Sequence, residues 1–457
     1  LSASSAASDV YKRQDLAPRS AVFDLANSLA ALMDEMQGEG IEPKALKNLD
    51  ISDVSGHWER ALLFVNIVQG YFEGGAIPDT ETRQRACVLA LAEGWKASPP
   101  NHPIIMAGST GSRGTTFQLM LAIAGLPQGA IVLPGFDFDM PSNVWDKLSD
   151  PNTGEDHPQF RFSRLLNSLG MKAKQVVPWA GDAMTSSARN KLISLAMRPA
   201  PATHHWQKEG PNLKKLGEAT SEITWLEAPD QRIEAMAVSL RLRKAAETGE
   251  TVAVITPDRN LTRRISSILA AWNITPDDSA GIPLSLTAPG RFLLHILELA
   301  QPQITPEGLL ILLKHPLAHS SSDRGQHLLN TRELEIYLRR KGPAFLSPQS
   351  LLDWAKGRDL YLTWVNWLIS CVFSHWPTGS QSMESWLDHH CTIAKRLSNG
   401  PSETEGKLWD QAPGRDTKKI MDELLLHGPA AGDVDLLDYK SILHGVLGTS
   451  ETRDQNI

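Results

Sequence analysis

Apolar residues recur at helical spacing over the first hundred residues of the chain, and the period then changes. Beyond Pro99-Pro100, short apolar runs predict buried strands at 102–107 and 130–133, with a loop over 108–115 and a helix over 116–124 between them. This order is typical of a parallel sheet flanked by helices. The helices predicted before it cover residues 21–36, 58–72 and 80–95.

The sharpest pattern lies between residues 223 and 272. Two β-rich runs, ITWLEA at 223–228 and TVAVIT at 251–256, predict strands. Each is followed by a helix, the first beginning after Asp230 and ending at Gly249, the second beginning after Pro257-Asp258. In the first helix the apolar residues that fall on one face are Ile233, Met236, Ala237 and Leu240. We therefore place a domain boundary near residue 220.

Residues 291–457 are predicted to be mostly helical. Thr305 as N-cap and Pro306 as first helical residue open a helix that stops at Pro316. The Trp-rich stretch 354–386 and the segment 415–447 also show helical spacing.

Composition narrows the class of protein. The 457 residues, 41% hydrophobic and 21% charged, suggest about three globular domains and exclude a mainly disordered chain. No apolar run is long enough to span a bilayer. The net charge of -7 means that any contact with DNA or RNA must come from a local patch. Three cysteines without a CxxC pair fit a reducing cytosol, so we expect a cytoplasmic protein without membrane attachment.

A glycine-rich loop connects the predicted strand at 102–107 to the next helix. Backbone N–H groups at such a place can hold a phosphate. A P-loop, however, needs GxxxxGK[ST], and here Arg113 stands at the second glycine position with no lysine after it. We interpret the segment as a structural or DNA-contacting loop, not a Walker A motif. Its residues are Gly108, Ser109, Thr110, Gly111, Ser112 and Arg113.

Two further motifs contain acidic residues. Asp137-Phe-Asp139 follows the second predicted strand and resembles the Asp-x-Asp of metal-dependent glycosyltransferases, whose carboxylates share a cation. This is our alternative hypothesis for function. Asp438-Tyr-Lys440 has the letters of a nuclease core, but its surroundings show helical spacing, so we reject it.

His389-His390-Cys391 offers three metal-ligand types side by side. Adjacent residues of a helix diverge by about 100°, and no second pair stands at zinc-like spacing. We expect a polar surface there. No metal ligand and no catalytic residue are assigned anywhere in the chain.

A basic cluster follows the TVAVIT run. Arg259 and Arg263 lie four apart, on one face of the predicted helix, and Asn260 and Arg264 adjoin them. Guanidinium groups at the carboxyl end of a strand suit phosphate contacts, so these four residues are our candidate DNA-binding site.

Several long segments resemble the AddB family, subunits of the bacterial AddAB helicase–nuclease, in its alphaproteobacterial form. They extend over nearly all of 16–447. The segments are IIMAGSTGSRGTT at 104–116, LPQGAIVLPGFDFDMPSNVW at 126–145, HPQFRFSRLLNSLGM at 157–171, WLEAPDQRIEAMAVSLRLR at 225–243, TVAVITPDRNLTRRI at 251–265, AAWNITPDDSAGIPLSLTAPGRFL at 270–293 and LLILLKHPLA at 309–318.

The resemblance implies an α/β fold with large helical insertions, like a superfamily 1 helicase with degenerate RecA-like, P-loop NTPase-type sheets. Residues 1–14 are small and polar with no apolar stretch, so we expect a non-native leader there. The resemblance divides the remainder into a first helicase-like domain at 15–220, the start of a second RecA-like domain at 221–290 and an inserted helical domain at 291–457. It also implies DNA repair by recombination, DNA binding, and an AddA-type partner that supplies the motor in a heterodimer. In its light, the glycine-rich loop Gly108–Arg113 is a degenerate form of the helicase loop that senses nucleotide or DNA.

The chain departs from that family in ways that limit the expected activity. We expect a fragment without the family's carboxyl-terminal nuclease domain, and Mg²⁺ belongs to that domain, so no cofactor is expected here. Cys87, Cys371 and Cys391 do not match the spacing of the iron–sulfur cysteines found in some relatives. The sequence thus predicts a DNA-binding part that is not itself a motor; whether it is an enzyme stays open.

Overall fold

A computed structural model describes residues 22–41, 80–179, 187–301, 303–321, 323–402 and 404–453. The predicted leader at 1–14 and the predicted helix at 58–72 lie outside them. Contacts divide the chain into two units, Asn27–Glu227 and Leu1–Ala26 with Ala228–Ile457. The described residues are mostly helical, and their strands form three separate sheets of two strands each. The structure is compatible with an α/β fold carrying helical insertions, but it contains no RecA-like core among these residues.

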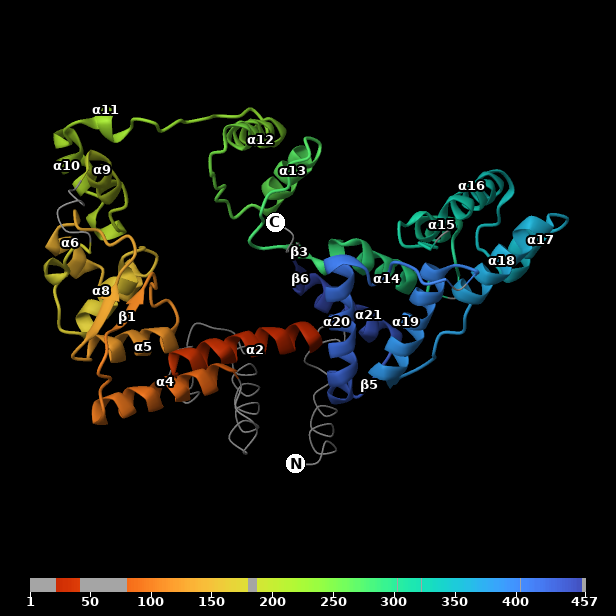
Figure 1. Ribbon diagram of the computed structural model, residues 1–457, viewed down its shortest axis with the longest axis horizontal. Coiled ribbons are helices and arrows are strands. Elements are labelled where there is room, and N and C mark those ends of the chain that lie inside the picture. The colour runs from red at the N-terminus through yellow and green to blue at the C-terminus, as the bar shows by residue number, and fades with distance from the viewer. Residues whose placement is uncertain are drawn as a thin grey trace, which may run out of the picture. The chain divides into compact units, whose positions relative to one another are not determined.

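The first unit contains the predicted strand–loop–helix–strand order. β1 (Ile104–Ala107) pairs in parallel with β2 (Gly129–Val132), and α5 (Gly114–Ala124) connects them. Phe117 and Met120 of α5 are buried against Leu165 of α8 (Phe160–Ser168). This crossover is therefore confirmed, with boundaries within two residues of the prediction (Figure 1).

The two-stranded sheet packs against α5, and the remaining helices of the unit lie before and after this crossover in the chain. Along the chain, the other helices of this unit are α2 (Val22–Glu39), whose first residues belong to the other unit, α4 (Thr80–Ala97), α6 (Ser142–Lys147), α7 (Pro151–Gly154), α9 (Ala188–Ala196), α10 (His205–Glu209) and α11 (Leu216–Ala219). Trp145 of α6 stacks on Phe136, and Phe162 of α8 lies near the same ring in a second apolar cluster, which fixes the loop after β2.

The second unit begins with a pair of helices, α12 (Gln231–Thr248) and α13 (Arg259–Ala270), which pack against each other (Figure 1). The predicted caps are present. The Asp230 carboxylate accepts the N–H groups of Arg232 and Ile233, both at 2.8 Å, and Gly249 ends α12 with φ of +71°. Local capping chemistry thus explains why both helices were predictable.

The strands predicted at 223–228 and 251–256 are wrong: neither segment pairs with a strand. Their apolar side chains lie in solvent, with Trp225 89% exposed and Ile255 96% exposed. The predicted apolar face of α12 is also open, since Ile233, Met236 and Leu240 are all more than a third exposed. A β-rich sequence forms a strand only when a neighbour completes its hydrogen bonds, and the described residues supply none here.

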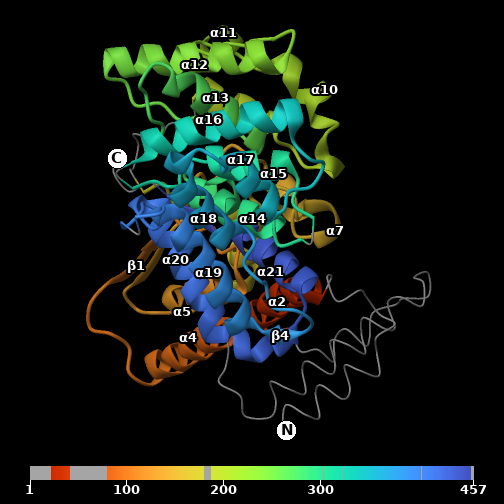
Figure 2. The ribbon, with the colours of Figure 1, turned by 90° about the vertical axis from the view of Figure 1, so that its right-hand side faces the viewer.

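The rest of the second unit is helical, as predicted. α14 (Ala288–Glu298) lies at its centre, and its Phe292 and Leu293 are fully buried against α15, α19, α20 and α21. Figure 2 shows these helices stacked, with α18 and α19 side by side. The helices after α14 are α15 (Pro306–Lys314), α16 (Arg324–Lys341), α17 (Pro348–Ala355), α18 (Asp359–Val372), α19 (Met383–Asn399), α20 (Gln411–His427) and α21 (Leu436–Thr449).

Two short antiparallel pairs close this helical region. β3 (Ile282–Pro283) pairs with β6 (Glu451–Thr452), and β4 (Gln381–Ser382) pairs with β5 (Asp433–Val434). The Trp386 indole donates a 2.9 Å hydrogen bond to the Val434 carbonyl and stacks on Tyr439. None of the helices in the described ranges combines the length and apolar character that crossing a bilayer requires.

Candidate functional sites

The glycine-rich loop is shaped by its own turns. Gly108 and Gly111 take positive φ, +80° and +66°, and the Ser109 hydroxyl accepts the Gly111 N–H at 3.2 Å. A Cβ on Gly111 would stand 2.9 Å from the Met120 sulfur. Both glycines therefore serve the local backbone, which positive φ and close packing require.

The N-terminus of α5, where a phosphate would bind, is covered by the end of α2. The Thr115 hydroxyl donates to the Gly38 carbonyl at 3.4 Å, and a Cβ on Gly114 would stand 2.5 Å from that same oxygen. The Glu39 side chain lies against Gly114 as well and pairs with Arg164 at 3.6 Å. A helix N-terminus favours an anion, and here the Glu39 side chain occupies the space beside it.

Arg113, which stands where a P-loop has its second glycine, is 77% exposed at its side chain and lies 3.8 Å from Glu81. The Gly38 carbonyl and the Glu39 side chain thus fill the space at the helix start, where a P-loop leaves its N–H donors open to a phosphate. The geometry thus agrees with the absence of the Walker A lysine.

Asp137 and Asp139 lie in the loop after β2. The Asp137 N–H donates to Gln159 Oε1 at 3.1 Å, and Asp137 Oδ1 accepts the Asp139 N–H at 2.9 Å. This is a carboxylate closing its own turn. Over the described ranges, no three His, Cys, Asp or Glu side chains gather in a way that could hold a metal ion.

The four residues of the predicted basic cluster at the start of α13 have different kinds of partner in the structure. Arg259 is occupied internally: its guanidinium lies 3.2 Å from Asp278 Oδ1 and donates to the Gly281 carbonyl at 2.7 Å. Asn260 lies beside it and receives a 2.8 Å hydrogen bond from Arg263. Arg259 therefore ties α13 to the following loop, which weakens its candidacy for DNA contact.

Arg263 and Arg264 differ from Arg259 because both are exposed and their side-chain partners are neutral. Arg263 binds the Asn260 amide and the Arg259 carbonyl, and Arg264 binds the amide oxygen of Gln231 on α12. No carboxylate in the described part of the chain pairs with either. Their positive charge is available to an external anion.

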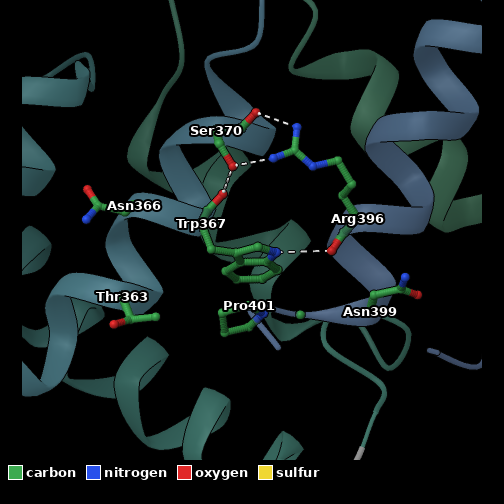
Figure 3. Close-up of a pocket in the computed structure, with 8 residues that line it drawn as sticks. Thr363, Asn366, Trp367, Ser370, Arg396, Asn399 and Pro401 are labelled. Carbon is green, nitrogen blue, oxygen red and sulfur yellow. Dashed lines mark hydrogen bonds between the residues drawn. The ribbon is translucent and has the colours of Figure 1, made fainter. Parts of the chain in front are cut away.

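A hollow of about 440 Å³ lies between α18 and the carboxyl-terminal end of α19 (Figure 3). Sequence reasoning missed it, because its two walls are about thirty residues apart and no motif joins them. The Trp367 indole donates a 3.0 Å hydrogen bond to the Arg396 carbonyl and so fixes one wall to the other. The lining residues are Thr363, Asn366, Trp367, Ser370, Arg396, Asn399, Gly400 and Pro401.

The expected polar surface at His389-His390-Cys391 is wrong for its central residue. His390 is fully buried; its Nε2 donates to the Leu293 carbonyl at 3.0 Å and its Nδ1 accepts from the Tyr439 hydroxyl at 2.9 Å. Burial lowers the pKa of His390 to about 4. It is a neutral, hydrogen-bonded core residue, which the pattern of α19 alone did not reveal.

His327 is buried in the same manner. Its Nε2 donates to the Leu313 carbonyl at 2.8 Å, and its Nδ1 accepts the Trp364 indole N–H at 3.1 Å. Burial lowers the pKa of His327 to about 4. Asp438 and Lys440, the rejected nuclease-like pair, lie in α21, so their predicted helical setting is confirmed.

No protein-family model and no curated protein matches the chain.

Proposed function

We propose that the chain is a helicase-like, DNA-binding part of a double-strand-break-repair helicase–nuclease subunit in the cytoplasm, acting beside an AddA-type motor subunit. The observation that carries this proposal is the pair of exposed arginines, Arg263 and Arg264, whose guanidinium groups bind only neutral groups. Exposed guanidinium groups without a carboxylate partner are typical contacts for a nucleic-acid backbone.

The arrangement of α12 and α13 supports the helicase-like part of the proposal. Gln231 at the start of α12 contacts Arg264, and Arg243 near its end lies over the Trp272 ring, 5.1 Å from its centroid. The two helices therefore run in the same direction. Parallel neighbouring helices are what consecutive β–α units produce.

The length of the connection between α12 and α13 agrees with the parallel direction of the two helices. α12 has 18 residues and so rises about 27 Å, and the chain must return over that length before α13 begins. The nine residues from Glu250 to Asp258 can span about 30 Å when fully extended. Residues 251–256 must therefore be nearly extended to reach the start of α13, although they form no strand.

The arginine pair is a small positive patch on a chain that is acidic overall. The chain is acidic overall, and ion pairs with Glu250 and Glu247 occupy Arg241 and Arg243 on α12. Arg263 and Arg264 thus give a small patch, which fits backbone contact better than wrapping of a long duplex.

The test is binding of a labelled blunt duplex and of a labelled single strand, followed by fluorescence anisotropy. Replacing Arg263 and Arg264 together by Ala should weaken binding about tenfold at about 0.1 M salt, because two charge-assisted phosphate contacts are lost. The matched control removes the same charge from α16 with Arg332→Ala and Arg340→Ala, and should leave binding unchanged. Equal loss in both double variants, or no loss in the first, would refute the proposal.

The glycosyltransferase alternative makes a different prediction. It requires binding of a nucleotide sugar that depends on Mn²⁺ and disappears in Asp139→Ala. Calorimetric titration with and without the metal separates the two functions, since the DNA-binding proposal predicts no metal-dependent heat with that ligand.

A further inference from the structure

The hollow between α18 and α19 is lined by polar residues of a helix that is mostly apolar. Thr363, Asn366 and Ser370 stand at i, i+3 and i+7, which places them on one face of α18 together with Trp367. The remaining faces of that helix carry residues such as Val365 and Leu368, both fully buried. The polar face is therefore the one that α18 turns toward the hollow.

Arg396 is the one charged residue among the eight that line the hollow. Its guanidinium donates to the Ser370 hydroxyl at 2.8 Å and to the Ser370 carbonyl at 3.4 Å (Figure 3). A guanidinium has five N–H donors, so three remain for a ligand. None of the ion pairs formed within the described ranges includes Arg396.

The neighbours of Arg396 add donors and no negative charge. Asn399 Oδ1 accepts the Gly406 N–H at 3.0 Å, which leaves the amide NH₂ of Asn399 as the part available to a ligand. The exposed Thr363 hydroxyl and Asn366 amide have no hydrogen-bond partner elsewhere in the described chain. A site rich in donors, with one uncompensated cation, selects an anion with several acceptor oxygens.

The apolar part of the lining suggests what the anion is attached to. Pro401 and the Trp367 ring form a wall, and the indole is fixed there by its hydrogen bond to Arg396. A volume of about 440 Å³ is much larger than a free phosphate needs and lies within the usual range of small-ligand sites.

We infer that this hollow binds a phosphate ester of mononucleotide size, with Arg396 on the phosphate and the Trp367–Pro401 wall against the organic part. The ester is either a free nucleotide or one unit of a single strand, since both present the same chemistry. The site uses no residue of α13 and stands independently of the DNA contact proposed above.

The probes are thymidine monophosphate, thymidine and a short oligothymidine, titrated calorimetrically into the whole chain. Thymidine monophosphate or the oligonucleotide should bind, and thymidine should bind at least about tenfold more weakly, because it lacks the anion. Arg396→Gln should weaken the binding by about tenfold or more, whereas Arg332→Gln on α16 should leave it unchanged.

A second variant protects the test against a folding defect, since Arg396 also links α18 to α19. Asn366→Asp keeps the shape of the side chain and places a negative charge in the hollow. It should therefore weaken phosphate binding without removing any contact inside the protein. A free nucleotide is the source if the monophosphate binds alone, and a strand is the source if only the oligonucleotide binds.

Three outcomes would overturn the inference: no binding of either phosphate probe, equal binding of thymidine and its monophosphate, or binding that survives both Arg396→Gln and Asn366→Asp. If Arg396→Gln and Asn366→Asp bind the oligonucleotide normally, but the variant without Arg263 and Arg264 does not, then the hollow is not a phosphate site and the proposed function stands.

Discussion

Acidification should destabilise the helical region of the second unit, because His327 and His390 are buried there as neutral imidazoles. Each uses one ring nitrogen as donor and the other as acceptor. Protonating His327 would turn a second N–H toward the indole N–H of Trp364, so the acceptor that Trp364 needs would disappear. The proton therefore costs the folded state both desolvation and a hydrogen bond.

The direction and size of the effect follow from the pKa values. Burial lowers the pKa of both histidines from 6.5 to about 4 in the folded state. As the pH falls the unfolded chain takes up these protons first, so stability is complete above pH 6.5 and is lost between pH 6.5 and 4. At pH 5 each histidine accounts for about 2 kcal/mol relative to pH 7, or about 4 kcal/mol together, a large part of the about 5–15 kcal/mol usual for a folded protein.

Urea unfolding at pH 7 and pH 5, followed by circular dichroism, measures this loss. In the double variant His327→Gln, His390→Gln, an amide can still donate and accept but does not titrate, so the part of the pH dependence that these two histidines contribute should disappear. The contribution of His315, whose pKa burial also lowers to about 4, should remain. His375→Gln, at an exposed position, is the control and should behave as the parent. A loss below about 1 kcal/mol in the parent, or an undiminished loss in the double variant, would refute the reasoning.

Four further predictions concern other parts of the chain. Leu269→Ala should lower the free energy of unfolding by about 2–4 kcal/mol in urea titrations, because Leu269 is buried between α12 and α13, whereas Ile255→Lys should change it by less than about 0.5 kcal/mol. Gly400→Ala should cost about 2 kcal/mol or more in the same assay, since φ is +85° and the added methyl would overlap the His319 ring. Cys87 is exposed and should be alkylated in the folded protein, while burial raises the pKa of Cys371 to about 11, so mass spectrometry should find that thiol modified only after unfolding. Purified protein should release no phosphate from ATP above background, and measurable turnover would contradict the account of the covered N-terminus of α5.

Features set by neighbouring residues were predictable from the sequence. Helix α12 begins after its N-cap Asp230 and ends at Gly249, and α13 begins after its N-cap Asp258. Thr305 caps α15, with its hydroxyl 3.1 Å from the Gly308 nitrogen. The crossover from β1 through α5 to β2 was also predictable, because each of its elements has its own apolar pattern. Capping and periodicity act within a few residues, so one sequence reveals them.

Features that depend on distant partners were not predictable. The runs at 223–228 and 251–256 have strand-like sequences, yet pairing needs a second strand that local pattern cannot supply. His390 looked like part of a polar surface, but its hydrogen-bond partners in the core, Leu293 and Tyr439, lie about a hundred and about fifty residues away in the chain. The position of Glu39 over the N-terminus of α5 and the hollow at Arg396 likewise result from tertiary packing.

The salt dependence of DNA binding tests the central claim most directly. The logarithm of the affinity falls with the logarithm of the salt concentration, with a slope of about 0.7–0.9 for each phosphate neutralised. The claim predicts that replacing Arg263 and Arg264 together by Ala reduces that slope by about 1.4–1.8, while the α16 control leaves it unaltered. A slope that stays the same in the arginine double variant would show that these side chains do not contact DNA.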